Sequence, residues 1–423
     1  MCSMRSHNAS TACPQAACFP AAHLPAARLP AARLPAARFA LGLYLALRVG
    51  LSGLAAVVRA LYRGDLGPHP VYRPYLGIPP IEGGWRGLLL GVWQRWDTLW
   101  YALIARRGYS LEDTSIFAPP LYPLLMRAMG RLLGGSEAAY LLGGLIVSNL
   151  ACLALFFYLY RLVELETDAR LARRGLVYLA LFPTAFFLLA AYAESLLLLC
   201  AVAALYHARR GQWVWAGVWA FFAPLARLPG SVLILPLAWE YGRQWWAARQ
   251  TPTPLPWWRG WPLAMGALGV VAFPLYVRLA LGADGLLAPF AVHTLRFAGR
   301  FALPGQSIVD AVRVLASGTF RLIEPFDLAF ALLFTALTVL SFWRLPSTYA
   351  VYCAVMLAGA LLKTGDVQPL LSVSRYLLML FPAFVLLARL GARSPWWNRA
   401  ILYPSLALLV FFCGQFVIWG WVG

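Results

Sequence analysis

Residues 182–210, with the sequence FPTAFFLLAAYAESLLLLCAVAALYHARR, indicate how this chain folds. The only acidic residue in this stretch is Glu194, and apolar residues continue on both sides of it until Arg209 and Arg210. A helix needs about 20 mostly apolar residues to cross a bilayer, and Arg and Lys gather at its cytoplasmic end. The stretch therefore predicts two membrane spans that meet at a non-cytoplasmic turn near Glu194.

The composition extends this prediction to the whole chain. Of the 423 residues, 61% are hydrophobic and 12% are charged, whereas soluble domains have about 45–50% apolar and about 25% charged residues. The net charge of +19 would suggest a nucleic-acid partner in a soluble protein, but here Arg flanks the apolar runs. The charge is therefore explained by membrane orientation, and no nucleic-acid partner is expected.

About eleven apolar runs are long enough to be candidate spans, which predicts an all-α polytopic membrane protein. They are residues 39–61, 136–160, 174–192, 194–208, 213–226, 229–241, 261–282, 326–344, 346–363, 376–390 and 400–421.

The loops between these runs suggest an orientation. If the N-terminus lies inside, the short Arg-rich loops are cytoplasmic, and loops 62–135, 283–325 and 364–375 lie outside. The outer loops mix both signs of charge, and their Arg residues need another reason to be there, such as an anionic substrate.

Residues 1–38 differ from the rest of the chain because LPAAR repeats run through residues 24–38. Regularly spaced Pro disfavours a helix, so we expect a disordered tail followed by one transmembrane domain over residues 39–423. None of the seven Cys has a CxxC spacing, which predicts neither a disulfide framework nor a metal site.

The first outer loop contains the segment QRWDTLWYALIARRGY, residues 94–109. Its apolar residues recur at helical spacing, which predicts a helix at the membrane surface. Asp97 lies among aromatic residues and next to Arg95, and a partly desolvated carboxylate of this kind is a candidate general base. The alternative is that Asp97 caps the helix or pairs with a neighbouring Arg. The aromatic residues Trp96, Trp100 and Tyr101 are candidate substrate contacts.

Further polar residues are expected on the same side of the membrane. The segment PPLYPLL, residues 119–125, predicts a short helix anchored at the interface by Tyr122. Glu194, flanked by Tyr192, is an acidic group at membrane depth, and such groups are usually functional. The alternative is a Glu exposed in a tight turn.

Two Arg residues complete this outer set. Arg227, in the sequence ARLPG, has a donor fork suited to phosphate, although it could instead form an ion pair with Glu194. Arg375, in the sequence SVSRY, enters the membrane from the same face. Together these residues predict an external site at the lipid boundary.

In order along the chain, WDTLWYALIARRGY, PPLYPLL, FPTAFFLLAAYAESLLLL, ARRGQWVWAGVWAFFAPLARLPG and SVSRYLLMLFPAF resemble the PIG-V family and its prokaryotic relatives over about residues 40–423. PIG-V is the second mannosyltransferase of GPI-anchor synthesis. This sequence has Pro119 where the family pattern has an aromatic residue, and RLPG where an RPTG-like pattern is usual.

The resemblance implies a GT-C fold glycosyltransferase. Such enzymes transfer a sugar, typically mannose, with inversion from a polyprenyl- or dolichyl-phosphate donor to a lipid or glycan acceptor on the non-cytoplasmic face. The acidic residue of the family's first outer loop corresponds to Asp97. Arg227, Arg375 and Arg95 would hold the leaving phosphate, and Glu194 would position a sugar hydroxyl or orient an Arg. No DxD pair is present, which predicts metal independence and no cofactor.

Other functions remain open from the sequence. A lipid-linked sugar transporter would place charges at mid-bilayer and show internal repeats. A non-catalytic membrane subunit would tolerate any residue at position 97, and a related transferase could use another sugar. The preference for Arg, with Lys363 as the one Lys, favours a prokaryotic plasma membrane over the endoplasmic reticulum.

Overall fold

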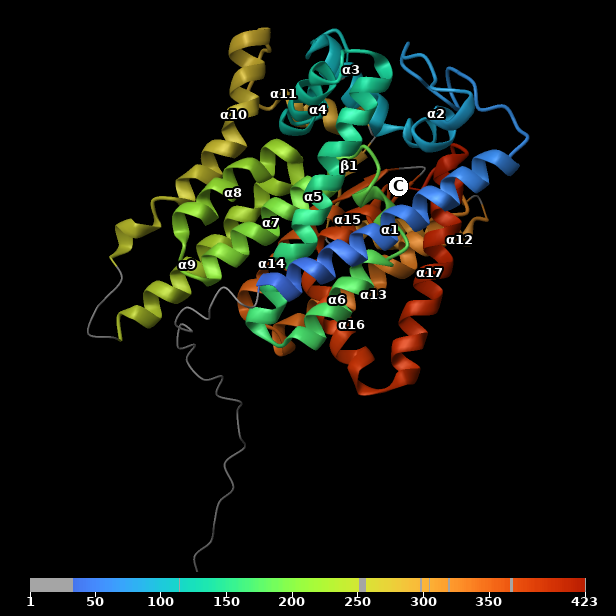
Figure 1. Ribbon diagram of the computed structural model, residues 1–423. Helices are drawn as coiled ribbons and strands as arrows, with labels where there is room; N and C mark the ends of the chain where they lie inside the picture. Colours follow the sequence, from blue (N-terminus) through green and yellow to red (C-terminus); the bar gives the residue numbers. More distant parts are fainter. Residues whose placement is uncertain are drawn as a thin grey trace, which may run out of the picture.

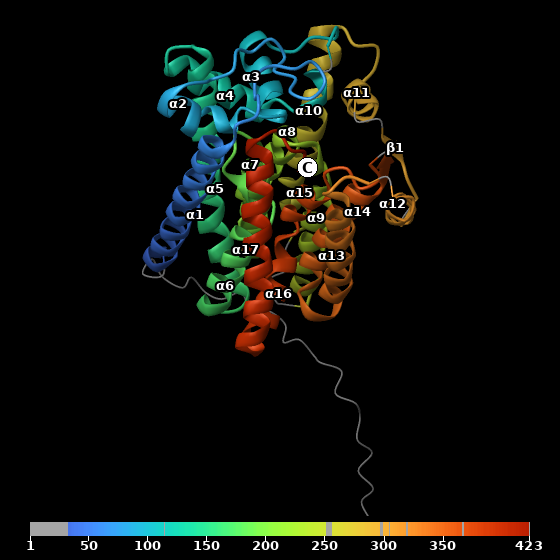
Figure 2. The same cartoon turned by 90° about the vertical axis from the view of Figure 1, so that its right-hand side faces the viewer.

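A computed structural model describes residues 33–113, 115–250, 256–296, 299–303, 305–318, 320–365 and 368–422 (Figures 1 and 2). Within these ranges the fold is almost entirely helical. The α-helices are α1 (Arg33–Leu61), α2 (Gly84–Leu89), α3 (Asp97–Arg107), α4 (Leu121–Leu132), α5 (Glu137–Glu166), α6 (Ala169–Ala180), α7 (Glu194–Arg209), α8 (Trp213–Ala226), α9 (Ile234–Ala248), α10 (Leu263–Leu281), α11 (Ala288–Arg296), α12 (Gln306–Ala316), α13 (Glu324–Arg344), α14 (Ser347–Leu361), α15 (Val373–Tyr376), α16 (Phe381–Arg393) and α17 (Pro395–Val417).

Shorter elements connect these helices. Two strands, β1 (Gly299–Phe301) and β2 (Lys363–Gly365), pair antiparallel with Arg300 opposite Thr364. The 3-10 helices are η2 (Gly91–Trp93), η3 (Ser115–Phe117), η4 (Ala185–Leu188), η5 (Leu228–Leu233), η6 (Trp257–Gly260) and η7 (Leu377–Met379).

Helix α7 lies at the centre of the molecule and packs against α5 and α8. All but two of its 16 residues are buried, and apolar side chains cover its whole circumference. A helix that is hydrophobic all round is stable only when protein or lipid surrounds it completely. The run from Glu194 to Arg209 is therefore the core around which the other helices assemble.

The chain is a helical membrane protein. Five helices in the described ranges are long and apolar enough to cross a bilayer, or up to six if one bent pair counts as a span. The expected number of eleven is not confirmed by these helices, because several of the predicted runs form shorter elements. The five are residues 34–61, 137–166, 257–281, 324–344 and 395–417.

The third predicted span, residues 174–192, was wrong as a continuous helix. Helix α6 ends at Ala180, and the chain continues through η4 as irregular backbone to Ala193. Residues 185–193 are nevertheless almost completely buried. Irregular backbone at membrane depth is tolerated only where protein surrounds it, and this condition is met here.

Two other boundaries differ from the expected ones. Helix α1 begins at Arg33, so the last residues of the expected tail are helical, and Pro35 is accommodated in the first turn. Residues 1–32 of that tail lie outside the described residues. The tenth predicted span, residues 376–390, is bent by 80° between residues 373–379 and 381–393.

The two ends of the bundle differ in character. Helices α2, α3 and α4 form a cap over one end, at the top of Figures 1 and 2. The junction between α16 and α17 lies at the opposite end, at the bottom of both views. Since α7 begins with Glu194 and ends at Arg209, these two residues lie about 22 Å apart along its axis.

Candidate active site

The helix predicted within residues 94–109 is present as α3, and Asp97 is its first residue. The preceding residue, Trp96, has φ 49° and ψ −117°, a backbone conformation that is rare for any residue except glycine. The main-chain N–H of Asp97 donates to the Tyr192 hydroxyl at 3.2 Å. The Asp97 side chain is therefore presented from a sharp turn whose geometry is fixed by its neighbours.

Arg375 is held from the other side of the site by a similar turn. Ser372, which precedes α15, has φ 62°. The main-chain N–H of Ser374 donates to Asp327 Oδ1 at 3.2 Å, and its carbonyl accepts a bond of 2.9 Å from Thr184 Oγ1. These two bonds fix the short helix that carries Arg375.

Arg227 lies at the end of α8, where the backbone changes to an extended conformation. The chain then turns back on itself, and Gly230 approaches α8 so closely that a Cβ would lie 2.2 Å from the carbonyl oxygen of Ala223. Only glycine fits such a contact. The glycine of the RLPG motif therefore serves to hold Arg227 in place.

Glu194 follows the irregular segment, whose buried carbonyls are satisfied by side chains. Asn149 Nδ2 donates to the carbonyl of Leu189 at 3.0 Å, and Ser148 Oγ donates to the carbonyl of Tyr192 at 2.7 Å. Buried carbonyls without partners would cost about 1–3 kcal/mol each. Helix α5 thus makes the unwound backbone before Glu194 possible.

These four charged residues meet in one cluster. Asp97 Oδ2 accepts a hydrogen bond of 2.9 Å from Arg375 Nη1. Arg375 Nε lies 3.3 Å from Glu194 Oε1, and the same oxygen accepts a hydrogen bond from Arg227 Nη1. Two carboxylates and two guanidinium groups therefore alternate, and their formal charges cancel.

Access to the cluster is uneven. The exposed fraction of the side chain is 15% for Asp97, 10% for Arg227 and 5% for Arg375, but only 1% for Glu194. Asp97 is therefore the acidic group that a substrate can reach. Glu194 is enclosed by protein and contacts both Arg side chains.

Aromatic rings surround the two guanidinium groups. The Arg375 guanidinium carbon lies 5.3 Å from the Phe187 ring centre and 5.6 Å from that of Tyr192. Both Arg375 and Arg227 also face the Tyr376 ring, at 5.7 and 5.5 Å. Such contacts stabilise the cations and fix their planes.

Tyr101 is electrostatically linked to all four charges. Burial raises the pKa of its phenol; Arg227 and Arg375 lower this pKa, and Asp97 and Glu194 raise it. The phenol therefore remains protonated at neutral pH and can donate a hydrogen bond. Its ring packs against Tyr122, with ring centres 4.8 Å apart.

Arg95 does not join the cluster. Its Nε donates to the carbonyl of Val417 at 3.0 Å, and its Nη1 donates to the carbonyls of Gly91 and Gln94. Burial lowers the pKa of Arg95 to about 10, so the group is still charged at neutral pH. Its donors are directed at the main chain of the surrounding structure.

The predicted aromatic contacts divide into two groups. Tyr122 and Tyr192 are fully buried, and Tyr122 donates to the carbonyl of Gly144 while Tyr192 donates to that of Arg95. Trp96 and Trp100 are partly exposed next to Asp97. The two buried Tyr side chains hold the scaffold, and the two Trp side chains can reach a ligand.

Asp327, Ser148 and Asn149 support the site but did not stand out in the sequence. Asp327 is an acidic residue inside a predicted span, which is a signal that could have been used. Ser148 and Asn149 are ordinary polar residues of a long apolar run, and only their tertiary partners distinguish them. In the described part of the chain, no group of three or more His, Cys, Asp and Glu residues could hold a metal ion.

A comparison with known protein families matches the segment that contains three of the four charged residues of this cluster. The family model for mannosyltransferase (PIG-V) matches residues 79–237. The chain resembles the PIG-V mannosyltransferases. The match includes Asp97, Glu194 and Arg227, whereas Arg375 lies outside it and reaches the PIG-V-like segment only through the tertiary structure.

The chain was also compared with curated proteins and with solved structures. No curated protein matches the chain. Among solved structures, the Archaeoglobus fulgidus oligosaccharyltransferase complex with Zn and sulfate is similar with a TM-score of 0.43 and 14% identity, covering 87% of this chain and 53% of that one. The apo form of the same protein gives a TM-score of 0.43 and 12% identity, covering 87% and 56%. The chain thus spans about half the length of these oligosaccharyltransferases. The PIG-V match and the membrane helices support a membrane glycosyltransferase.

Proposed function

We propose that this protein is a GT-C type membrane glycosyltransferase that transfers a sugar, typically mannose, from a polyprenyl- or dolichyl-phosphate donor to a hydroxyl of a lipid or glycan acceptor. The observation that carries the proposal is the ion pair between Asp97 and Arg375. It brings a reachable carboxylate and a phosphate-binding side chain to within hydrogen-bond distance. The family match over residues 79–237 supports the same reaction class.

Arg375 and Arg227 would hold the donor phosphate. Guanidinium groups bind phosphate oxygens through paired, charge-assisted hydrogen bonds. Both Arg residues lie in a largely desolvated setting, where such bonds are stronger than in water. As the sugar leaves, negative charge grows on the phosphate, and two fixed cations stabilise that charge.

Asp97 would act as the general base. It takes the proton from the acceptor hydroxyl, and the oxygen then attacks the anomeric carbon from the face opposite the phosphate. A new carbon–oxygen bond forms while the anomeric bond to the phosphate oxygen breaks, and the phosphate keeps the bonding electrons. The configuration at the anomeric carbon is inverted.

Donor binding would also prepare the base. In the structure described, Arg375 neutralises Asp97, which makes this carboxylate a poor proton acceptor. A donor phosphate competes with Asp97 for the same guanidinium. Once the phosphate takes that contact, the carboxylate becomes more basic, so activation follows occupancy of the donor site.

Glu194 and Arg95 would be positioning residues. Glu194 bridges the two Arg side chains from the buried side, because both contact its Oε1. Arg95 fixes the backbone just before Trp96. The acceptor hydroxyl would contact Asp97, and the sugar would contact Tyr101 and the exposed edges of Trp96 and Trp100.

The active site would face the non-cytoplasmic side of the membrane. The cap that carries Asp97 lies at one end of the bundle, whereas helix ends rich in Arg, such as the start of α6 and the end of α16, lie at the other (Figure 2). Short basic loops remain in the cytoplasm. A polyprenyl-phosphate sugar would therefore approach the site from the outer or luminal leaflet.

The test uses membranes that contain the wild type, Asp97→Asn or the matched control Asp65→Asn, with labelled polyprenyl-phosphate mannose and total lipid extract. Asp65 belongs to the same outer loop, but 75% of its side chain is exposed. We expect transfer by the wild type and by the control, and a loss of roughly 10²–10⁴-fold in Asp97→Asn. Equal transfer by all three proteins would remove Asp97 from the role of base. If no donor sugar among mannose, galactose and arabinose is transferred by the wild type, the proposal is overturned.

A further inference from the structure

A groove runs along α9, and none of its lining residues belongs to the Asp97 cluster. Its lining residues on α9 recur at helical spacing from Leu235 to Ala247 and therefore form one continuous helix face, which Gln250 extends just beyond the helix end. The 12 steps from Leu235 to Ala247 correspond to a length of about 18 Å. Val351 and Val355 of α14 form the opposite wall.

The floor of this groove is apolar and built from small residues. Ala238, Gly242 and Ala247 lie along it, and no atom lies within 4 Å of a Cβ built at Gly242. The groove is open on one side and has a volume of about 860 Å³, which is in the range of about 300–1,000 Å³ that is typical of ligand pockets. Its shape is suited to an extended hydrocarbon chain.

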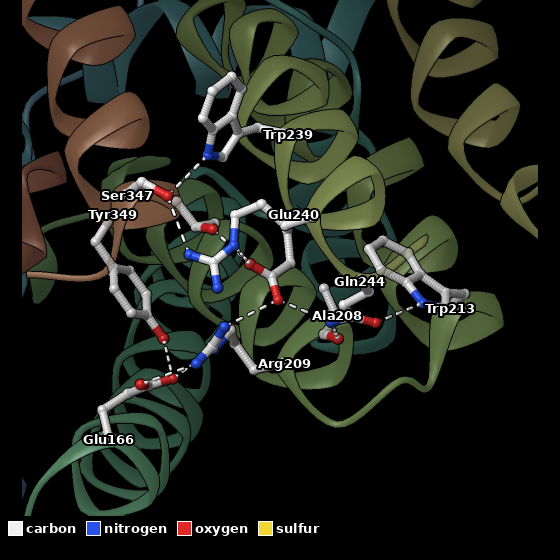
Figure 3. Close-up of polar contacts among 11 residues, drawn as sticks. Glu166, Ala208, Arg209, Trp213, Trp239, Glu240, Gln244, Ser347 and Tyr349 are labelled. Atoms are coloured by element: carbon white, nitrogen blue, oxygen red, sulfur yellow. Dashed lines mark hydrogen bonds and ion pairs between the residues drawn. The ribbon is translucent and has the colours of Figure 1, made fainter. Parts of the chain in front are cut away.

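Polar donors gather at one point along the groove. Trp239 Nε1 donates to Ser347 Oγ at 2.9 Å, and Arg243 Nη1 donates to the same oxygen at 3.0 Å. Figure 3 shows Trp239 and Ser347 beside the network that contains Glu240. Ser347 Oγ accepts from both groups, and a serine hydroxyl is also a donor.

The charge of Arg243 is poorly neutralised. The nearest carboxylate oxygen is Glu240 Oε2, 3.9 Å from Arg243 Nε. Glu240 is 1% exposed and is already bound by Arg209 at 2.9 Å, by Gln244 at 2.8 Å and by Thr348 (Figure 3). The Arg243 side chain is 40% exposed, so its charge is available to a ligand in the groove.

We propose that this groove binds an anionic membrane phospholipid. The headgroup phosphate would accept hydrogen bonds from Arg243 and Ser347, and one acyl chain would lie over Gly242 between α9 and α14. Trp246, which is 62% exposed, borders the groove, and Trp residues favour the headgroup level of a bilayer. The site shares no residue with the Asp97 cluster and does not depend on the proposed transferase activity.

The experiment measures lipid binding to the delipidated full-length protein by native mass spectrometry in detergent, with phosphatidylglycerol, phosphatidylcholine and polyprenyl phosphate as probes. Two variants change the groove: Arg243→Gln removes the charge, and Gly242→Leu fills the floor. Two matched controls leave the groove unchanged. Arg249→Gln removes an Arg that stacks on Trp245 at the end of the same helix, and Gly359→Leu adds a side chain in open space on α14.

We expect the wild type and both controls to bind phosphatidylglycerol at least fivefold more tightly than phosphatidylcholine. Arg243→Gln should lose this preference, and Gly242→Leu should weaken binding of both phospholipids about tenfold. Melting curves establish that each variant is folded. Equal binding of the two phospholipids by the wild type, or unchanged binding by Gly242→Leu, would refute the proposal. Polyprenyl phosphate that binds more tightly than phosphatidylglycerol, with the same dependence on Gly242, would assign the groove to another lipid and also overturn it.

Discussion

Asp97 and Arg375 are 278 residues apart in the chain, yet Asp97 Oδ2 and Arg375 Nη1 lie 2.9 Å from each other. A non-glycine residue with positive φ precedes each of them: Trp96 directly before Asp97, and Ser372 three residues before Arg375. Backbone strain of this kind persists only where the surrounding structure enforces it, and it gathers at functional sites. The pair therefore joins the cap of the protein to its C-terminal third at a point that the rest of the fold holds in place.

Replacing Arg375 with Lys should impair donor binding more than folding. A Lys ammonium is a single point charge and cannot face Asp97 and Glu194 with separate nitrogens, as the guanidinium does. Losing one charge-assisted hydrogen bond costs about 1.5–3 kcal/mol, so the KM for the donor should rise about tenfold or more. Initial rates at varied donor concentration give the KM. Arg131→Lys, on the exposed face of α4, is the matched control, and an unchanged KM in Arg375→Lys would contradict the assigned role.

Replacing Glu194 with Gln should destabilise the protein strongly. The change leaves the buried Arg227 and Arg375 without their shared carboxylate, and breaking a buried ion pair costs about 3–5 kcal/mol. Thermal unfolding in detergent measures the loss. Asp65→Asn, in an exposed pair with Arg73, should cost only about 0.2–1 kcal/mol.

A double variant measures the coupling energy between Glu194 and Arg227 apart from the cost of changing each side chain. Arg227→Gln combined with Glu194→Gln should cost less than the sum of the two single changes, because neither charge is then left alone. Strictly additive effects would show that the contact between Glu194 and Arg227 contributes no coupling energy.

Replacing Gly230 with Ala should also destabilise the protein. The added Cβ would overlap the main chain of Ala223 and Pro224, which cannot move away without distorting α8. Overpacking of this kind costs about 1–3 kcal/mol, and the displacement of Arg227 should lower transfer as well. The matched control is Gly242→Ala, in open space on α9, which should be neutral or stabilising by about 0.5–1 kcal/mol. Similar melting temperatures for Gly230→Ala and the wild type would show that the turn can relax.

Replacing Arg95 with Met should lower stability without changing the KM for the donor. The three carbonyls that now accept its hydrogen bonds would lose a partner, at about 1–3 kcal/mol for each buried group left unsatisfied. Melting temperature and donor KM are measured on the same preparation. A folded Arg95→Met protein with a raised donor KM would show that Arg95 takes part in binding the donor phosphate.

Several features of the fold follow from the sequence. The sequence predicted the exact bounds of α8 (Trp213–Ala226) and the bounds of α7 (Glu194–Arg209) to within one residue, because apolar runs end where Arg, Gly or Pro interrupts them. It failed for residues 174–192, which are apolar but leave the helix at Ala180. Hydrophobicity shows that a segment is buried, whereas side chains from α1, α3 and α5 decide whether its carbonyls can be satisfied outside a helix.

The sequence by itself determined that the chain is a helical membrane protein, and it singled out Asp97, Glu194, Arg227 and Arg375 as polar residues expected on one side of the bilayer. Only the tertiary structure decided their contacts: Asp97 meets Arg375, Glu194 is enclosed between two Arg side chains, and Arg95 turns to the main chain. The physical reason is that burial depends on the composition of each segment, which is local. An ion pair depends on where distant segments are packed, and no local pattern records that position.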